Sequence, residues 1–355
     1  MQHHTGTGFK NNYTDAVPGS ARDLLRWQWN ALRKHLPPPP LTPTPVVAPN
    51  LAAIHANAGA AMQPAITWIG HATMLVQASE LNVLTDPVFS QRASPVQCLG
   101  PQRAQPPGVA LTDLPPIDAV VISHNHYDQL DKHAVLALHR RAKVATLFIV
   151  PLRLKAWFTR QGIHNVVELD WWQQHTLREV EFHLTPVQHW AARMRGDRFQ
   201  TLWGGWAVFG ADFHWYFSGD TGYSQDFKDT RERFQTCSPE GFDIALIAVG
   251  AYEPRWFMQN QHINPAEAVQ IHRDLHAKRS VGVHWGTFNL TDEPLDQPPA
   301  RPGRRPHCPG RVRGRILLAQ NWRNPRPARP PGWFKIAALL LPSAPCPPCP
   351  TTPAT

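Results

Sequence analysis

A short histidine-rich motif, Ser123-His124-Asn125-His126-Tyr127-Asp128-Gln129, constrains this chain more than any other feature. It follows the largely apolar segment 117–122, which has the length of a buried strand, and precedes apolar residues that recur at helical spacing. Residues two apart on an extended segment share a face, so His124 and His126 point the same way, while Asp128 can aim at a second point nearby. The motif therefore predicts two neighbouring metal ions where a strand gives way to a helix, with ligands that suit zinc.

Six further segments accompany this motif in order along the chain: Trp68–Thr73, Thr85–Phe89, Thr185–Trp190, Leu202–Trp206, Phe217–Gly222 and His284–Phe288. Together they resemble the N-acyl-phosphatidylethanolamine phospholipase D branch of the metallo-β-lactamase superfamily, which includes bacterial relatives and has the sugar-phosphate lactonases as cousins. The resemblance implies an α+β fold, the metallo-β-lactamase αββα sandwich, in which two mixed β-sheets are flanked by helices.

The resemblance also implies a set of metal ligands. Six residues that follow apolar strands match the family positions: His124, His126 and His189 for a first ion, Asp128 and His284 for a second, and Asp220 as a bridge between them. Where the family has one more histidine, this chain has Gln129, whose neutral amide oxygen is a weaker zinc donor than imidazole. We therefore expect two zinc ions, with Gln129 at a weakened second site.

In such a centre two ions share a hydroxide, because they lower the pKa of the parent water towards ~7, and they clamp the oxygens of an in-line displacement. Asp128 and Asp220 are thus implied to be catalytic as well as metal-binding. The resemblance places Gln261 and His262 against the substrate, where they would contact a phosphate oxygen or the leaving group, and His262 counts as a third catalytic candidate. The alternative is that His262 only closes the loop before Asn264, the predicted helix cap.

Other polar residues near these motifs are interpreted as structural. His71 is expected to orient loops near the site by hydrogen bonds, and Asp86 either supports the site or shapes a turn. The remaining histidines that lack a motif are expected at the surface: His133, His139, His164, His175 and His272.

The body alternates strands and helices, as a core of two sheets covered by helices requires. The predicted strands are Ile66–Ile69, Met74–Gln77, Asn82–Thr85, Ala119–Ile122, Thr146–Val150, Val166–Leu169, Arg178–Leu184, Trp206–Phe209, Trp215–Ser218, Ile244–Val249 and Val281–His284. Helices are predicted after Asp128, Pro151 and Asn264. The last has a clear start signal, because Asn264 is followed by Pro265 and, three residues after the cap, by Glu267.

The formal charge of +9 belongs to one end of the chain. Residues 298–355 contain ten Arg and Lys and no Asp or Glu, so residues 1–297 carry 25 basic and 26 acidic side chains. A nucleic-acid partner requires a basic face on the folded domain, and we expect none. The five cysteines form no evident disulfide framework, and no apolar run approaches the ~20 residues that cross a bilayer. We expect a cytoplasmic protein, with peripheral contact at the inner face of the membrane as an alternative.

Three regions follow from these patterns. Residues 1–50 form an N-terminal arm with a Pro-rich linker, and its basic, Trp-containing helix 21–35 either lies on an anionic membrane or packs on the main domain. Residues 51–297 form the catalytic domain. Residues 298–355 hold 15 of the 37 prolines and are expected to be a disordered tail, or a frame-shifted reading of the gene.

The leading hypothesis is a zinc-dependent hydrolase of the phospholipase D type, which cleaves the phosphodiester of N-acyl-phosphatidylethanolamine or a related amphiphile through a metal-bridging hydroxide. One alternative is a lactonase or phosphodiesterase that acts on a small phosphorylated substrate. The other is a catalytically impaired binding protein with one metal, because Gln129 replaces a ligand. The sequence leaves the acyl preference and the oligomeric state open.

Overall fold

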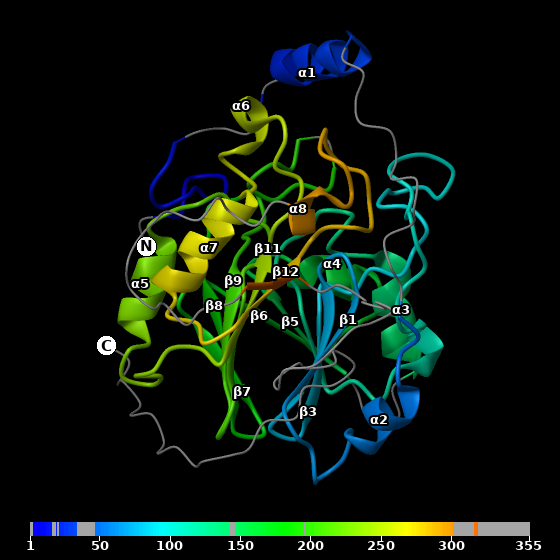
Figure 1. The fold of residues 1–355 in the computed structure, drawn as a ribbon, viewed down its shortest axis with the longest axis vertical. Helices are drawn as coiled ribbons and strands as arrows, with labels where there is room; N and C mark the ends of the chain where they lie inside the picture. The colour runs from blue at the N-terminus through cyan, green and yellow to red at the C-terminus, as the bar shows by residue number, and fades with distance from the viewer. Residues whose placement is uncertain are drawn as a thin grey trace, which may run out of the picture.

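Two β-sheets packed face to face, with helices on their outer sides, form the body of the protein (Figure 1). The computed structural model describes residues 3–15, 19, 21–33, 47–141, 146–194, 196–300 and 316–318. The first sheet consists of β1 (Ala65–Gly70), β2 (Thr73–Ala78), β3 (Leu81–Thr85), β4 (Ala119–Val121), β5 (Leu147–Pro151) and β6 (Val166–Leu169), in that order. The second has the order β13 (Ile316–Leu318), β12 (Ser280–Val283), β11 (Ile244–Ala248), β10 (His214–Phe217), β9 (Gly205–Phe209), β8 (Val180–Thr185) and β7 (Gln174–Leu177).

Both sheets are mixed, which confirms the expected αββα sandwich. In the first, β1, β2 and β3 pair antiparallel and β3 to β6 pair parallel. In the second, β7 to β10 pair antiparallel and β10 to β13 pair parallel. Parallel neighbours end at the same edge of a sheet, so the loops after β3, β4, β10 and β12 gather there.

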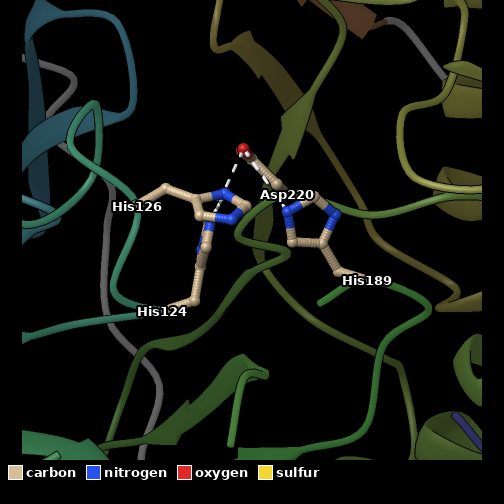
Figure 2. A group of neighbouring side chains, drawn as sticks. All are labelled: His124, His126, His189 and Asp220. Carbon is tan, nitrogen blue, oxygen red and sulfur yellow. Dashed lines mark hydrogen bonds and ion pairs between the residues drawn. The ribbon is translucent and has the colours of Figure 1, made fainter. Parts of the chain in front are cut away.

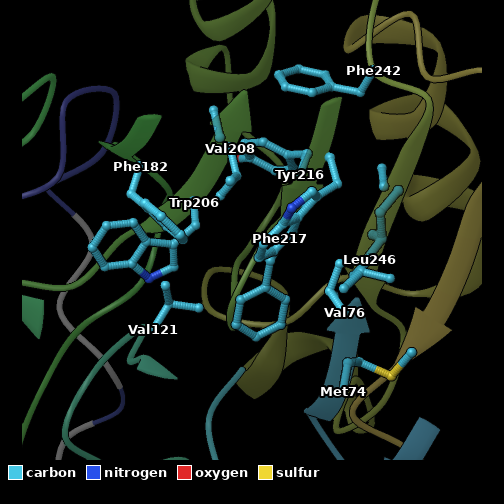
Figure 3. Close-up of a cluster of buried hydrophobic side chains, with 14 of the residues drawn as sticks. Met74, Val76, Val121, Phe182, Trp206, Val208, Tyr216, Phe217, Phe242 and Leu246 are labelled. Atoms are coloured by element: carbon cyan, nitrogen blue, oxygen red, sulfur yellow. The ribbon is translucent and has the colours of Figure 1, made fainter. Parts of the chain in front are cut away.

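The core lies in two layers because successive residues of a strand face opposite sides of its sheet. On β2, Met74 and Val76 face the second sheet, whereas Leu75 belongs to the cluster under the outer helices. Figure 3 shows the layer between the sheets, where Trp206 and Phe217 of the second sheet point toward the side of Val121, Met74 and Val76 of the first. Strands buried on both faces explain the nearly continuous apolar runs in the sequence.

Helices cover the outer faces. The first sheet is covered by α3 (Lys132–Arg141), α4 (Lys155–Arg160) and, near β2, the short α2 (Leu51–Ala56). The second is covered by α5 (Asp226–Arg233) and α7 (Pro265–Asp274), as Figure 1 shows. The cap predicted for α7 is present, since Asn264 accepts hydrogen bonds from the Ala266 and Glu267 amides and the Glu267 carboxylate accepts one from the Asn264 amide. Short helical segments complete the described chain: η1 (Leu111–Asp113), α6 (Arg255–Met258) and α8 (Gln297–Ala300).

Several local details differ from the sequence expectations. Arg178 and Glu179 form the turn of a β7–β8 hairpin, both with positive φ, rather than the start of a strand. The expectation that His272 lies at the surface is wrong: it is buried on α7, with its Nδ1 2.8 Å from Ser280 Oγ. Strand β13, at the edge of the second sheet, lies within the segment 298–355, for which we expected no regular structure.

The described parts of the N-terminal arm contact the body at two places. Residues 3–15 lie against it, with Phe9 buried in the main core cluster. Helix α1 (Ala21–Arg33) touches α6 through Trp27, whose ring stacks on Phe257 and whose Nε1 donates to Asp292 Oδ1 at 2.7 Å. In the described chain we find no helix with the length and apolar character needed to cross a membrane.

Candidate metal centre

Four side chains from three loops converge at the edge where the parallel strands end (Figure 2). His124 and His126 follow β4, His189 follows β8 and Asp220 follows β10. Their ligand atoms all lie within 4.8 Å of one another. His124 Nε2 is 2.8 Å from His126 Nδ1 and 3.7 Å from Asp220 Oδ2, while His189 Nε2 is 4.0 Å from the same oxygen. Three imidazoles and one carboxylate are a ligand set that suits zinc.

The second layer of contacts fixes which ring nitrogen faces this centre. His189 Nδ1 donates to the Gln261 carbonyl at 2.9 Å, so its Nε2 keeps a lone pair, and that buried atom has no hydrogen-bond partner. His124 Nδ1 lies 2.9 Å from Ser123 Oγ, which in turn donates to Asp86 at 2.5 Å. Such contacts orient metal-binding imidazoles. Asp86 therefore contacts the site from behind through Ser123, as one of its two interpretations expects, and its φ of 33° also places it in a turn.

Burial sets the protonation of these imidazoles. It lowers the pKa of His124 to about 3 and that of His262 to about 4, and it lowers the pKa values of His126 and His189 as well. These side chains are thus neutral at ordinary pH, which is the form that binds metal. The donor atoms and their protonation states fit a metal ion.

A second group adjoins the first and shares its carboxylate. His71, Asp128 and His284 have ligand atoms within 4.8 Å of one another, and so do Asp220, His262 and His284. His71 Nε2 and His284 Nε2 both lie 3.2 Å from Asp128 Oδ2, and His284 Nε2 is 3.1 Å from Asp220 Oδ2. Asp220 thus lies between the two groups, where the family resemblance implies a bridging ligand.

The carboxylates give this second group a strong preference for positive charge. Burial by itself would raise the pKa of Asp220 and Asp128, but the contacts with His284 hold both well below their ordinary values. Against the effect of burial, the same two carboxylates raise the pKa of His284 to about 10. A proton on His284 balances the two carboxylates in the protein alone, and a divalent cation between them would meet the same need.

Gln129 points into the centre but presents a hydrogen-bond donor. The residue is fully buried, and its Nε2 donates to both carboxylate oxygens of Asp220 at 3.1 Å. The amide oxygen Oε1 has no hydrogen-bond partner. The metal-binding roles of Gln129 and of the six matched residues stay predictions, but the structure brings all seven side chains together.

Comparison with known proteins places this centre in a family. The profile of the β-lactamase superfamily domain matches residues 81–285. The chain belongs to the metallo-β-lactamase superfamily. Over 234 residues it is 42% identical to the N-acyl-phosphatidylethanolamine-hydrolyzing phospholipase D 1 of Caenorhabditis elegans, a match that covers 63% of this chain and 64% of that protein, which is less than two thirds of its length.

An uncharacterized protein of Mycobacterium tuberculosis is 39% identical over 279 residues, which cover 77% of this chain and 71% of that protein. These identities confirm the resemblance to the phospholipase D branch and to bacterial members of it. Among solved structures, an isothiocyanate hydrolase from Delia radicum gut bacteria has a similar fold, with a TM-score of 0.50 and 21% identity over 63% of this chain and 86% of that chain.

A cavity of about 260 Å³ opens beside the metallo-β-lactamase centre. Its inner end is lined by His126, Asp128, Asp220 and the two predicted substrate contacts, Gln261 and His262. Its outer wall is mostly apolar and combines residues of the arm, of α6 and of neighbouring loops: Leu24, Trp27, Trp190, Phe257, Met258 and Leu290. Arg198 adds a guanidinium, which lies over the Trp190 ring at 4.7 Å. The cavity thus has polar, metal-capable side chains at one end and mostly apolar side chains at the other.

The side chain of Gln261 is hydrogen-bonded to Trp190 in the wall of the cavity. Its Oε1 accepts a hydrogen bond of 2.7 Å from Trp190 Nε1, and its main-chain carbonyl holds His189. Gln261 therefore links the cavity wall to the metal centre. His262 stacks on His284 with ring centroids 5.4 Å apart, and its Nδ1 is buried without a hydrogen-bond partner.

Two features of the site were not predicted from the sequence. His71 belongs to the second metal-capable group, although we expected it only to orient loops. The N-terminal segment also reaches the site, because Asn11 Nδ2 donates to the His189 carbonyl and Asn11 Oδ1 accepts from the His189 amide, both at 3.0 Å. Nearer the N-terminus of this segment, His3 and His4 are each hydrogen-bonded to the buried carboxylate of Asp170 at 2.7 Å. Isolated polar residues of this kind carry no periodic signal that would reveal them.

Proposed function

We propose that this protein is a zinc-dependent hydrolase that cleaves the phosphodiester of N-acyl-phosphatidylethanolamine or a related amphiphile. The observation that carries the proposal is the union of two metal-capable groups through Asp220 at the inner end of an apolar cavity. The Caenorhabditis elegans relative named for hydrolysis of N-acyl-phosphatidylethanolamine supports the substrate class.

In this proposal the residues of the centre bind the metal ions, and the residues of the cavity position the substrate. His124, His126 and His189 would hold a first zinc ion, and Asp128 and His284 a second, with Asp220 shared. When bound, the ions supply Lewis acidity and lower the pKa of water, which is the chemistry that phosphodiester hydrolysis needs. The carboxylates of Asp128 and Asp220 would neutralise part of the charge of two zinc ions, and the positive charge that remains would attract an anionic phosphodiester.

The cavity has polar and apolar parts that suit the headgroup and the acyl chain of an amphiphilic substrate. We assign Arg198 to the approach of the phosphate, because its guanidinium is a bidentate partner for phosphate oxygens. His262 and Gln261 lie where the leaving group would contact the wall, and the apolar side chains of α1 and α6 suit the acyl chain.

The outer surface around the cavity favours peripheral membrane contact. On α1, Leu24, Leu25 and Trp29 are 41%, 65% and 57% exposed, and on α6 Trp256 is 42% exposed. Arg22, Arg26 and Arg33 lie on the same helix. A basic helix with exposed apolar side chains binds anionic bilayers. We therefore propose that this face meets the membrane, while Trp27 of the same helix packs on the body.

A panel of substrates tests the proposal. The zinc-loaded protein is given N-acyl-phosphatidylethanolamine in mixed micelles, a soluble aryl phosphodiester and a lactone, with the Asp220→Ala variant as the control. We expect turnover to be highest for the amphiphile. Faster hydrolysis of the soluble ester or the lactone would favour the small-substrate alternative. Tight binding of one ion without turnover of any substrate would favour the impaired protein, an alternative to which the donor orientation of Gln129 points.

A further inference from the structure

The second metal group has no imidazole at residue 129, where the resemblance to the phospholipase D branch implies one. Gln129 does not present a lone pair to the site in its place. Its Nε2–H groups face the carboxylates, at 3.1 Å from both oxygens of Asp220 and 3.5 Å from Asp128 Oδ2. An amide N–H carries no lone pair for a cation. In this arrangement Gln129 holds Asp220 in place, and the coordination of a second ion must come from other side chains.

His71 occupies a position from which it can supply that coordination. Its side chain is 1% exposed, its Nε2 lies 3.2 Å from Asp128 Oδ2, and its ring centroid is 4.0 Å from that of His284. Together with Asp128 and His284 it forms a group whose ligand atoms all lie within 4.8 Å of one another. His71 Nδ1 is also buried without a hydrogen-bond partner, so no contact on the far side of the ring fixes it for another role.

The backbone around His71 ties it to the segment that carries His284. The His71 amide donates to Thr287 Oγ1 at 2.7 Å, and the His71 carbonyl accepts from the His284 amide at 3.0 Å. His71 has φ of 53°, in the left-handed region that a histidine adopts only when the surroundings hold it there. The two imidazoles are thus preorganised as a pair beside Asp128.

We propose that His71 replaces the missing histidine, so that the second zinc ion is held by His71, Asp128, Asp220 and His284, while Gln129 positions Asp220 as a hydrogen-bond donor. Two imidazoles and two carboxylates form a zinc-type ligand set. The inference rests on the proposed two-metal centre and adds to it the identity of the fourth ligand.

Zinc content tests this directly. The full chain and its His71→Ala, His71→Ala/Gln129→His and His272→Ala variants are equilibrated at the same buffered free zinc, and zinc per chain is measured by mass spectrometry. His272 is the matched control, as another buried histidine outside the centre. We expect two ions for the wild type and the control, and one for His71→Ala. We expect a second-site affinity lowered about 10–100-fold or more in that variant, and recovery of the second ion in the double variant.

X-ray absorption at the zinc edge separates a ligand from a residue that only orients Asp128, and it uses the wild-type protein, so the result does not depend on the folding of a variant. If His71 is a ligand, the two ions of the wild type share five imidazoles, and if it only orients Asp128 they share four. Four imidazoles, a single ion in the wild type, or two equally tight ions in His71→Ala would overturn the inference. A wild-type protein that binds no zinc would instead overturn the proposed metal centre. The failure of this inference can therefore be told apart from the failure of the proposed function.

Discussion

At the residue scale, the proposed function depends on a carboxylate that two groups of potential ligands share. Asp220 lies 3.7 Å from His124 Nε2 and 3.1 Å from His284 Nε2, so its removal takes a donor from both groups at once. We predict that Asp220→Ala and His126→Ala each reduce kcat/KM for the amphiphile by more than about 100-fold, since each ion contributes several kcal/mol to the transition state. Steady-state assays check this, with His133→Ala on the surface of α3 as the control. Near-full activity of either variant would show that the ligands are assigned wrongly.

Ser123 and Asp86 support His124 from behind the proposed first metal site. Ser123 Oγ links His124 Nδ1 to Asp86, so Ser123→Ala should leave both groups short of a partner. We expect zinc affinity at the first site to fall about 10–100-fold, as for other changes behind metal ligands. Competition with a chromophoric chelator measures it. An unchanged affinity would mean that the histidine is held in place by packing alone.

The sequence revealed those residues that sit in motifs at strand ends. His124, His126 and Asp220 follow apolar strands, and the edge at which parallel strands end is a property of the topology. His71 was placed near the site but not among the ligands, because its proposed role depends on a left-handed backbone and on a contact with a loop more than two hundred residues away. Long-range contacts of single residues leave no pattern in a sequence.

At the element scale, the N-terminal segment is part of the site. Asn11 satisfies both main-chain groups of His189, which are buried. We predict that Asn11→Ala lowers the free energy of unfolding by about 1–3 kcal/mol, because a buried amide loses its partner. Urea denaturation measures the change, and Thr7→Ala, at an exposed position of the same segment, is the control. Equal stability of the two variants would contradict the role given to Asn11.

Helix α1 offers a separate prediction about membranes. Leu25 and Trp29 are exposed on it and do not line the cavity. We predict that Leu25→Ser/Trp29→Ala weakens binding to vesicles of anionic phospholipid about tenfold or more, since each side chain carries on the order of 1 kcal/mol of partition free energy. Hydrolysis of a soluble phosphodiester should be unchanged. Sedimentation with vesicles gives the first quantity, and equal binding by the wild type and the variant would exclude this face as the contact.

The elements themselves were largely predictable. Continuous apolar runs such as Ile244–Ala248 and the Asn264 cap mark a buried strand and a helix start by local chemistry. The hairpin at Arg178 and Glu179 was not, because two charged residues with positive φ lack the Gly or Asn signal of a tight turn. The short β13 was missed because three apolar residues in a Pro-rich segment do not stand out.

At the scale of the whole molecule, the sandwich should be independent of the segment that follows it. In the described chain β13 adds three residues to the edge of β12, which is already paired with β11 along its length. We predict that removal of residues 298–355 leaves a protein that unfolds cooperatively, with Tm lowered by only a few degrees. Thermal unfolding followed by circular dichroism measures this. A truncated chain without a cooperative transition would mean that this segment supplies part of the core.

One labelling experiment tests the proposed metal-dependent hydrolysis of an amphiphilic phosphodiester. The full chain, loaded with zinc, is incubated with N-acyl-phosphatidylethanolamine in H₂¹⁸O, and the products are analysed by mass spectrometry. We predict release of phosphatidic acid that carries one ¹⁸O on its phosphate, while the released N-acylethanolamine carries none. Neither chelator-stripped protein nor Asp220→Ala should release either product. Absence of phosphatidic acid from the zinc-loaded protein, or equal release by Asp220→Ala, would contradict the account.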